Sequence, residues 1–242
     1  MKDSTKNIIL YSNEITDLIQ QKKIECIFLG GSSLEKLESS ESDYNVIVIT
    51  SDEYYNTVYK EDLFSSYKWL RFPKTVQITI CNLSHLFNLI HRSPSSYNRY
   101  AYEQIKYLLL LKEEDILFAS KKFKNFYREI QKFKEPLGAF CLESSLHASK
   151  DLLLNDLLLH YNKNIYNFYK ALYYWNNFLN TNDIFLTEEQ KRFLINLKET
   201  KKIPKNIQNS LRKIFPYFSQ TKRYNHYSLR EELLELWERK FI

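Results

Sequence analysis

The chain has 242 residues, of which 44% are apolar and 26% charged, a balance typical of globular proteins that argues against wholesale disorder. The net charge of +6 is weaker than that of most dedicated DNA-binding domains, yet compatible with a phosphate-bearing ligand. The apolar runs are too short to cross a bilayer, and the first residues lack the core of a secretory signal, so we expect a cytoplasmic protein without a membrane partner.

The first half of the chain predicts a small mixed sheet. A helix is expected over residues 5–22, and the strand after it stops at Gly30 and Gly31, two of only three glycines in the chain. Paired glycines let the backbone turn sharply or approach another group closely. Apolar and β-branched runs predict strands over residues 24–29, 46–50 and 75–81, with a short edge strand at 116–118. Two further helices are expected over residues 83–92 and 97–111.

The second half predicts helices only. Helical periodicity gives helices over residues 121–133, 142–161, 165–179, 187–199, 207–218 and 228–240. Thr187 and Gln190 have the spacing of a capping box. We therefore expect an α+β chain, with a mixed-sheet domain over residues 1–120 followed by an all-helical domain over residues 121–242.

Three cysteines, Cys26, Cys81 and Cys141, are scattered singly along the chain. An odd, widely spaced set argues against a disulfide framework or a structural zinc site. Cys26 and Cys81 lie in apolar runs typical of strands, so the simplest interpretation is that these two are small buried apolar residues. The aromatic run over residues 166–178 is interpreted mainly as helical core, with base stacking as the alternative.

One segment has the spacing of a known signature. A strand ends in Gly30-Gly31-Ser32, a polar loop follows, and Ser42-Asp43-Tyr44-Asn45 then leads into the next strand. This arrangement resembles the core of nucleotidyltransferases of the DNA polymerase beta superfamily, in a divergent form similar to those that modify small molecules such as antibiotics. Gln77, on the following predicted strand, best occupies the place of that family's third carboxylate.

The resemblance implies a function and a site. Gly31, Ser32 and Ser42 would bind the phosphates of ATP or GTP, and Asp43, Asn45 and Gln77 would form the Mg²⁺ site. The reaction would transfer a nucleoside monophosphate to a hydroxyl of a small-molecule acceptor, in a cleft between the two domains. Asn45 and Gln77 stand where the family has carboxylates, however, and Mg²⁺ prefers hard anionic oxygen, so a weak or altered metal site is expected.

Glu143 is the candidate general base, because some relatives of that family use a glutamate from the helical domain. The alternative interpretation of Glu143 and His147 is a solvated helix face. Three interpretations of the whole motif stay open: coincidence, weakened catalysis, and a catalytically degenerate protein that binds a nucleotide or a partner. A nucleic-acid partner is possible but not favoured, since the basic run at residues 198–205 also fits a solvated loop. The sequence does not fix the oligomeric state.

Overall fold

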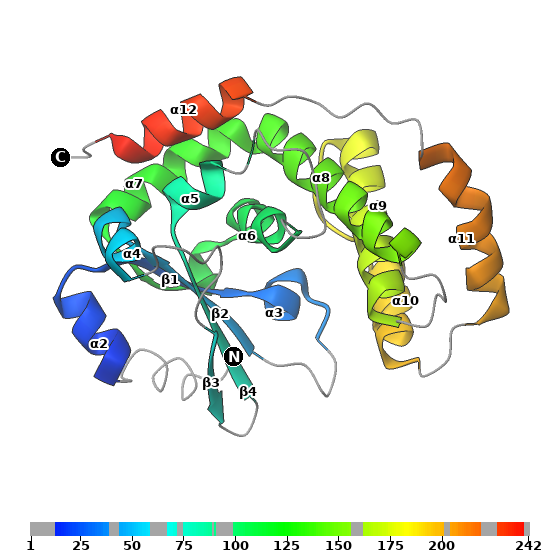
Figure 1. Cartoon of the computed structure of the whole chain (residues 1–242), viewed down its shortest axis with the longest axis horizontal. Helices are drawn as coiled ribbons and strands as arrows, with labels where there is room; N and C mark the ends of the chain where they lie inside the picture. Colours follow the sequence, from blue (N-terminus) through cyan, green and yellow to red (C-terminus); the bar gives the residue numbers. More distant parts are fainter. Residues whose placement is uncertain are drawn as a thin grey trace. The chain divides into compact units, whose positions relative to one another are not determined.

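The computed structural model describes residues 13–38, 44–58, 67–71, 75–88, 90, 99–155, 162–200, 204–218 and 227–239. Its described strands form one mixed sheet of five, in the order β3–β4–β2–β1–β5 (Figure 1). The strands are β1 (Ile24–Gly30), β2 (Tyr44–Thr50), β3 (Tyr67–Arg71), β4 (Thr75–Cys81) and β5 (Ile116–Ala119). β2 and β4 run parallel, and the other neighbouring pairs are antiparallel. The expected α+β class is confirmed.

Helices make up most of the rest of the described chain. In chain order they are α2 (Asn13–Gln20), α3 (Gly31–Glu35), α4 (Asp52–Val58), α5 (Leu83–Asn88), α6 (Arg99–Leu110), α7 (Lys121–Ile130), α8 (Lys134–Asn155), α9 (Asn162–Thr181), α10 (Glu188–Glu199), α11 (Lys205–Phe218) and α12 (Tyr227–Glu238). The expected first helix is described only from Asn13 onward. Helix α8 begins at Lys134, whereas the periodicity predicts a start at residue 142. Pro136 is tolerated in this helix because it lies in the first turn, where a missing N–H costs nothing.

The chain forms two compact units, and each is discontinuous in sequence. Unit 1 comprises residues 1–90, 107–134 and 228–242, and unit 2 comprises residues 91–106 and 135–227. Unit 1 contains the sheet, and unit 2 is helical in its described part. The chain therefore crosses between the units several times, whereas the sequence alone suggested a single boundary at residue 120.

One face of the sheet in unit 1 is closed by a cluster of aliphatic side chains. Its buried members are Ile24, Ile27, Leu29, Val46, Val48, Val76 and Ile78. Because side chains alternate along a strand, the residues between them point to the opposite face. That opposite face carries Asn45 and Gln77, and this places both amides away from the aliphatic cluster.

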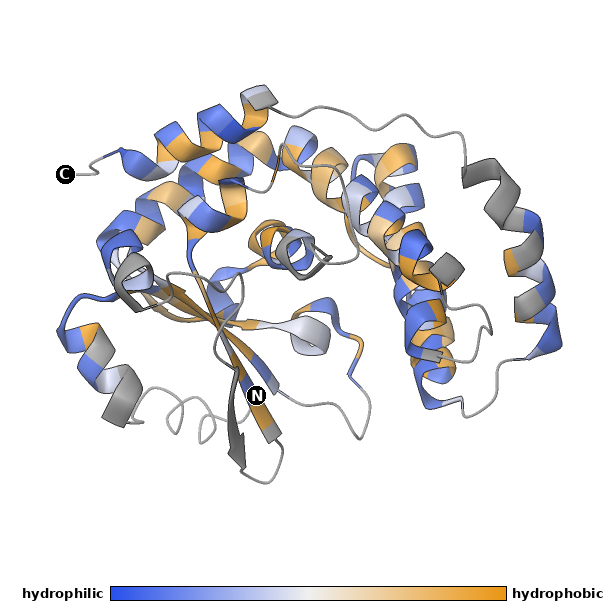
Figure 2. Cartoon of the chain, in the orientation of Figure 1, coloured by the Kyte–Doolittle hydropathy of each residue, from blue (hydrophilic) through white to orange (hydrophobic). Residues whose placement is uncertain are grey.

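Helix α12 packs in unit 1 through Trp237, which is fully buried. Its ring meets Phe126 of α7 edge-on with 5.1 Å between centroids, and Lys122 Nζ lies 3.8 Å from its centroid. The indole N–H donates to the carboxylate of Asp52 at 3.2 Å. Figure 2 shows α12 alternating between hydrophilic and hydrophobic positions, as expected for a helix that buries one face. The last described helix thus completes the sheet-bearing unit.

The predicted capping box at the start of α10 is present. Thr187 Oγ1 accepts from the Gln190 backbone N–H at 3.2 Å, and Gln190 Oε1 accepts from the Thr187 N–H at 2.9 Å. We expect Thr187→Ala to lower the free energy of unfolding by about 1 kcal/mol, because it removes the acceptor for a helix N–H. Urea unfolding measures this, and Thr181→Ala, at the exposed end of α9, is the matched control. An equal loss in both variants would contradict the capping role.

None of the helices in the described ranges is long and apolar enough to cross a membrane.

Candidate functional site

The strand register brings three positions of the sequence motif onto one line across the sheet. Gly30 at the end of β1 pairs with Asn45 at the start of β2, and Asn45 pairs with Gln77 at the start of β4. Directly paired residues direct their side chains to the same face, and neighbouring strands lie roughly 4.8 Å apart. The amide side chains of Asn45 and Gln77 are therefore neighbours. We call Gly30, Gly31, Asn45 and Gln77 the motif end of the sheet.

Gly31 lies directly against Asn45. Its φ of +65° falls in the left-handed region that side chains disfavour. A Cβ atom built on Gly31 would lie 2.3 Å from Asn45 Nδ2 and 2.8 Å from Asn45 Cγ. A side chain at this position would collide with Asn45. The glycine therefore lets the backbone pass close to the Asn45 amide where α3 begins. The glycine signal found in the sequence thus has a steric cause in the fold.

The described residues at the motif end supply no carboxylate pair. Asn45 and Gln77 are half-buried neutral amides, and the described part of the chain contains no group of three or more His, Cys, Asp or Glu side chains able to hold a metal ion. Two other carboxylates of unit 1 already have hydrogen-bond partners. Glu38 accepts from Ser33 Oγ at 2.8 Å, and Asp52 accepts from Ser84 Oγ at 2.9 Å.

A two-metal site does not fit this donor set. Mg²⁺ takes hard anionic oxygen and gives up water reluctantly, whereas Asn45 and Gln77 offer only neutral amide oxygens. Asp43 and Ser42, the other predicted members of the site, lie outside the described residues. Asp43 is the one residue of the motif whose side chain carries a negative charge.

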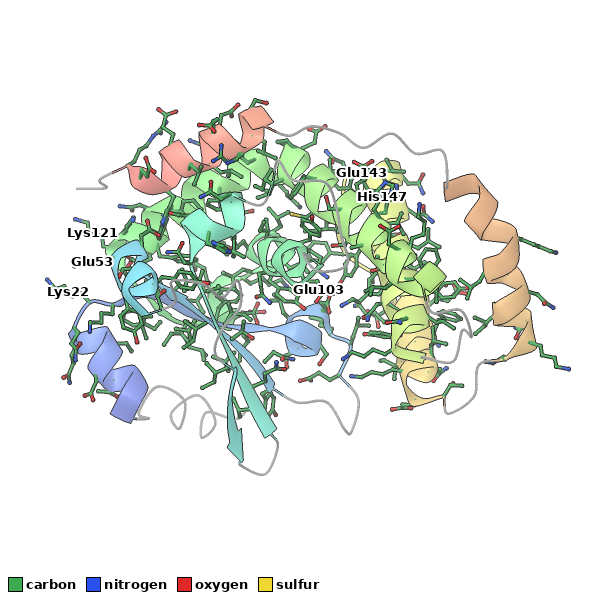
Figure 3. All side chains as sticks on the ribbon, in the orientation of Figure 1. Lys22, Glu53, Glu103, Lys121, Glu143 and His147 are labelled. Carbon is green, nitrogen blue, oxygen red and sulfur yellow. The ribbon has the colours of Figure 1, made fainter. Side chains whose placement is uncertain are left out.

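Glu143 lies on α8 in unit 2, where it is buried. Glu143 Oε1 lies 3.9 Å from Nε2 of His147, one turn further along the same helix (Figure 3). Both side chains are about nine-tenths buried, so the interpretation of this pair as a solvated helix face is wrong. The polar side chains of Glu143 and His147, which suggested exposure, are buried among the packed helices of unit 2.

Two buried lysines of unit 2, Lys106 and Lys170, were not predicted from the sequence. Lys170 on α9 lies 3.5 Å from Glu103 on α6, and Lys106 on α6 lies 4.6 Å from the centroid of the Tyr174 ring. Both lysines are at least nine-tenths buried. The lysine-rich composition hid them, because nothing in the local pattern distinguishes a buried lysine from a solvated one. The aromatic run is core as predicted: Phe168, Tyr169, Tyr174 and Phe178 are buried.

The three cysteines are buried and free, which confirms the interpretation of Cys26 and Cys81 as small buried apolar residues and shows that Cys141 is buried as well. Burial raises the pKa of the Cys81 thiol to about 12, and it raises the pKa values of the Cys26 and Cys141 thiols as well. Since the thiolate is the reactive form, none of them is placed to act as a nucleophile at neutral pH.

This burial predicts the chemistry of the thiols. At pH 8 we expect iodoacetamide to leave all three cysteines of the native protein unmodified and to alkylate all three in urea. The raised pKa values keep the thiols protonated until the pH exceeds them, and burial blocks access to the reagent. Mass spectrometry of the intact protein counts the adducts. Rapid modification of native protein would contradict the buried placement.

The sequence matches no family model, and it matches none of the curated proteins. Among solved structures it is similar to a nucleotidyltransferase-like protein from Exiguobacterium sibiricum 255-15, at 12% identity and a TM-score of 0.35, over 96% of this chain and 71% of that one. Because the TM-score is this low, the similarity supports no conclusion about function. The candidate site therefore rests on the geometry of this chain alone.

Proposed function

We propose that this chain is a nucleotidyltransferase-like protein that binds a nucleoside triphosphate, ATP or GTP, at the motif end of its sheet, with transfer chemistry reduced or lost. The observation that carries the proposal is the register: Gly30, Asn45 and Gln77 are directly aligned on neighbouring strands, as the sequence motif requires. A chance match of isolated residues in the sequence would not predict this alignment.

The residues at this end suit phosphate oxygens. Gly31 lets the backbone pass close to the Asn45 amide, and the Ser32 hydroxyl can donate a hydrogen bond. The amide groups of Asn45 and Gln77 each carry two N–H donors, whereas carboxylates at the same places would repel a triphosphate unless a cation lay between them. Replacing both carboxylates by amides therefore favours direct contact with phosphate and removes ligands that transfer chemistry needs.

Magnesium has a reduced role in this proposal. A Mg²⁺ ion would be carried mainly by the phosphates of the nucleotide, with Asp43 as the one carboxylate of the motif available to it. We therefore expect nucleotide binding to depend only weakly on Mg²⁺.

The two amides provide the test of where the nucleotide binds. We expect Asn45→Leu and Gln77→Leu each to weaken the binding of a fluorescent ATP analogue by about 10- to 150-fold, since each removes a donor to a charged oxygen, worth about 1.5–3 kcal/mol. Asn176→Leu, at an exposed position on α9, is the matched control and should bind as the wild type does. Unchanged affinity in both sheet variants, with their folds intact by circular dichroism, would place the nucleotide elsewhere or exclude it.

A second candidate function is transfer of a nucleoside monophosphate to a hydroxyl of a small-molecule acceptor. One observation favours it: Glu143 is a buried carboxylate beside His147, a pair suited to accept and pass on a proton. Pyrophosphate release from ATP with Mg²⁺ and a panel of polyhydroxylated acceptors tests it. Release that Glu143→Gln abolishes while nucleotide affinity is kept would establish transfer, and the absence of release with every acceptor would leave binding as the function.

A further inference from the structure

A groove of about 610 Å³ lies in unit 1 beside β5 and α7. All four residues of β5, Ile116 to Ala119, line it. Because successive side chains of a strand point to opposite faces of the sheet, a groove lined by four consecutive residues follows the edge of the strand and not one face. All four residues are half-buried, as expected at an edge open on both faces.

β5 forms one edge of the described sheet. β5 is the last strand in the sheet order, so among the described residues no strand pairs with its outer side. Ser120 N–H donates to the Glu25 carbonyl at 2.8 Å, and Ala119 lies opposite Cys26. In an antiparallel ladder the residues alternate between facing the partner strand and facing away from it. Ala119 therefore directs its own N–H and C=O outward, away from β1.

The opposite side of the groove carries hydrogen-bond donors. Lys124, Arg128 and Gln131 are spaced four and three residues apart, so they lie on one helical face, and all three line the groove. Lys124 and Arg128 are exposed and form no ion pair with any residue that the structure describes. Gln131 Nε2 is buried, with no hydrogen-bond partner among the described residues. The one acidic residue of the lining, Glu113, leaves the groove with a net positive charge.

We propose that this groove binds an extended acidic segment of a partner protein, which adds as a further strand to the outer edge of β5. The segment's backbone would pair with the outward groups at Ala119, and its acidic side chains would meet Lys124 and Arg128. A small anion would use the cationic stripe but not the unpaired strand edge. A nucleic-acid strand could use the cationic and aromatic side chains of the groove but would leave the outward backbone groups of Ala119 unpaired. The groove lining contains no residue of the motif end of the sheet.

The test uses the full-length protein and a fluorescent, end-capped peptide of alternating valine and glutamate, with its valine–lysine counterpart as the comparison. We expect the glutamate peptide to bind more tightly in fluorescence anisotropy, with an affinity that falls as salt is added. Ala119→Pro removes the outward N–H at a place where an edge strand tolerates proline, and we expect it to weaken binding by about tenfold. Ala119→Val keeps this N–H and should bind normally.

A second test of the groove reverses charges on α7 and leaves β5 unchanged. The Lys124→Glu/Arg128→Glu pair should abolish binding of the glutamate peptide and admit the lysine peptide. Lys121→Glu, at the exposed start of the same helix and outside the groove lining, should leave affinity within about twofold of the wild type (Figure 3). Equal binding of both peptides would overturn the proposal, as would full affinity in the Ala119→Pro variant.

Other occupants give distinct results. Self-association in sedimentation equilibrium that Ala119→Pro abolishes would identify a second copy of the chain and overturn the proposal. Strong protection of the Ala119 amide from hydrogen exchange in the isolated monomer would overturn it too, because the edge would already be covered. Displacement of the glutamate peptide by a single-stranded oligonucleotide at stoichiometric concentration would point to nucleic acid instead. A freely exchanging Ala119 amide that the glutamate peptide protects would support it.

Discussion

The double variant Asn45→Asp/Gln77→Asp should bind Mg²⁺ more tightly than the wild-type protein does. The two positions are paired directly on β2 and β4, so the introduced carboxylates would lie side by side on one face of the sheet. With Asp43 they would restore the anionic oxygens that a divalent ion prefers. Without Mg²⁺ we expect the variant to be less stable than wild type by about 1 kcal/mol, because like charges lie directly opposite each other.

Added Mg²⁺ should reverse that loss and exceed it. An ion that binds only the folded state at about 100 times its Kd adds about 2.7 kcal/mol to the free energy of unfolding. Urea unfolding with and without Mg²⁺ measures both effects, and the two single variants serve as controls with one added carboxylate each. If Mg²⁺ leaves the stability of the folded double variant unchanged, Asn45 and Gln77 do not occupy the metal positions of the motif.

Gly31→Ala should be strongly destabilising, by about 2–5 kcal/mol. The left-handed backbone at Gly31 costs a residue with a Cβ about 1–2 kcal/mol, and forcing extra atoms into a packed site costs a further 1–3 kcal/mol or so. The added methyl would lie 2.3 Å from Asn45 Nδ2, so the Asn45 side chain would have to move. Urea unfolding measures the loss, and the fluorescent ATP analogue should also bind more weakly.

Two further variants separate the cost of the left-handed backbone at Gly31 from the cost of the collision with Asn45. In Gly30→Ala the closest contact of the added methyl is the flexible Ile47 side chain, at 2.8 Å, and the backbone is ordinary and extended, so we expect a smaller loss than at Gly31. In the Asn45→Ala background the collision with the amide is absent, and Gly31→Ala should cost about 1 kcal/mol less than it does alone. Strict additivity of the two substitutions would show that Gly31 and Asn45 do not touch.

The elements that position the candidate site could be predicted from the sequence. The β-branched run over residues 46–50 is buried in the centre of the sheet, and the glycine pair ends β1 as the sequence suggested. The choice of Gln77 as the third motif position is consistent with its direct pairing to Asn45. These features are local, since runs of β-branched residues and paired glycines act within a few residues of themselves.

The features that were missed depend on contacts between distant parts of the chain. The amphipathic pattern of α12 could not show that Trp237 packs against Phe126 and donates to Asp52 in unit 1. Strand β3 was not predicted, because the five residues Tyr67–Arg71 show too little alternation of apolar and polar side chains to be distinguished from a loop. Glu143 looked like a surface residue because charge usually marks solvent, and only the packing of the helices shows that it is buried.

The most direct test of the central claim is a calorimetric titration of ATP and GTP into the wild-type protein, with Mg²⁺ and with EDTA. We predict binding in both conditions, with Kd values that differ by less than about tenfold, because neutral amide donors would contact the phosphates and only one motif carboxylate remains. Binding that is absent in both conditions would contradict a nucleotide site at the motif end of the sheet. Binding that requires Mg²⁺ absolutely would contradict the role assigned to Asn45 and Gln77.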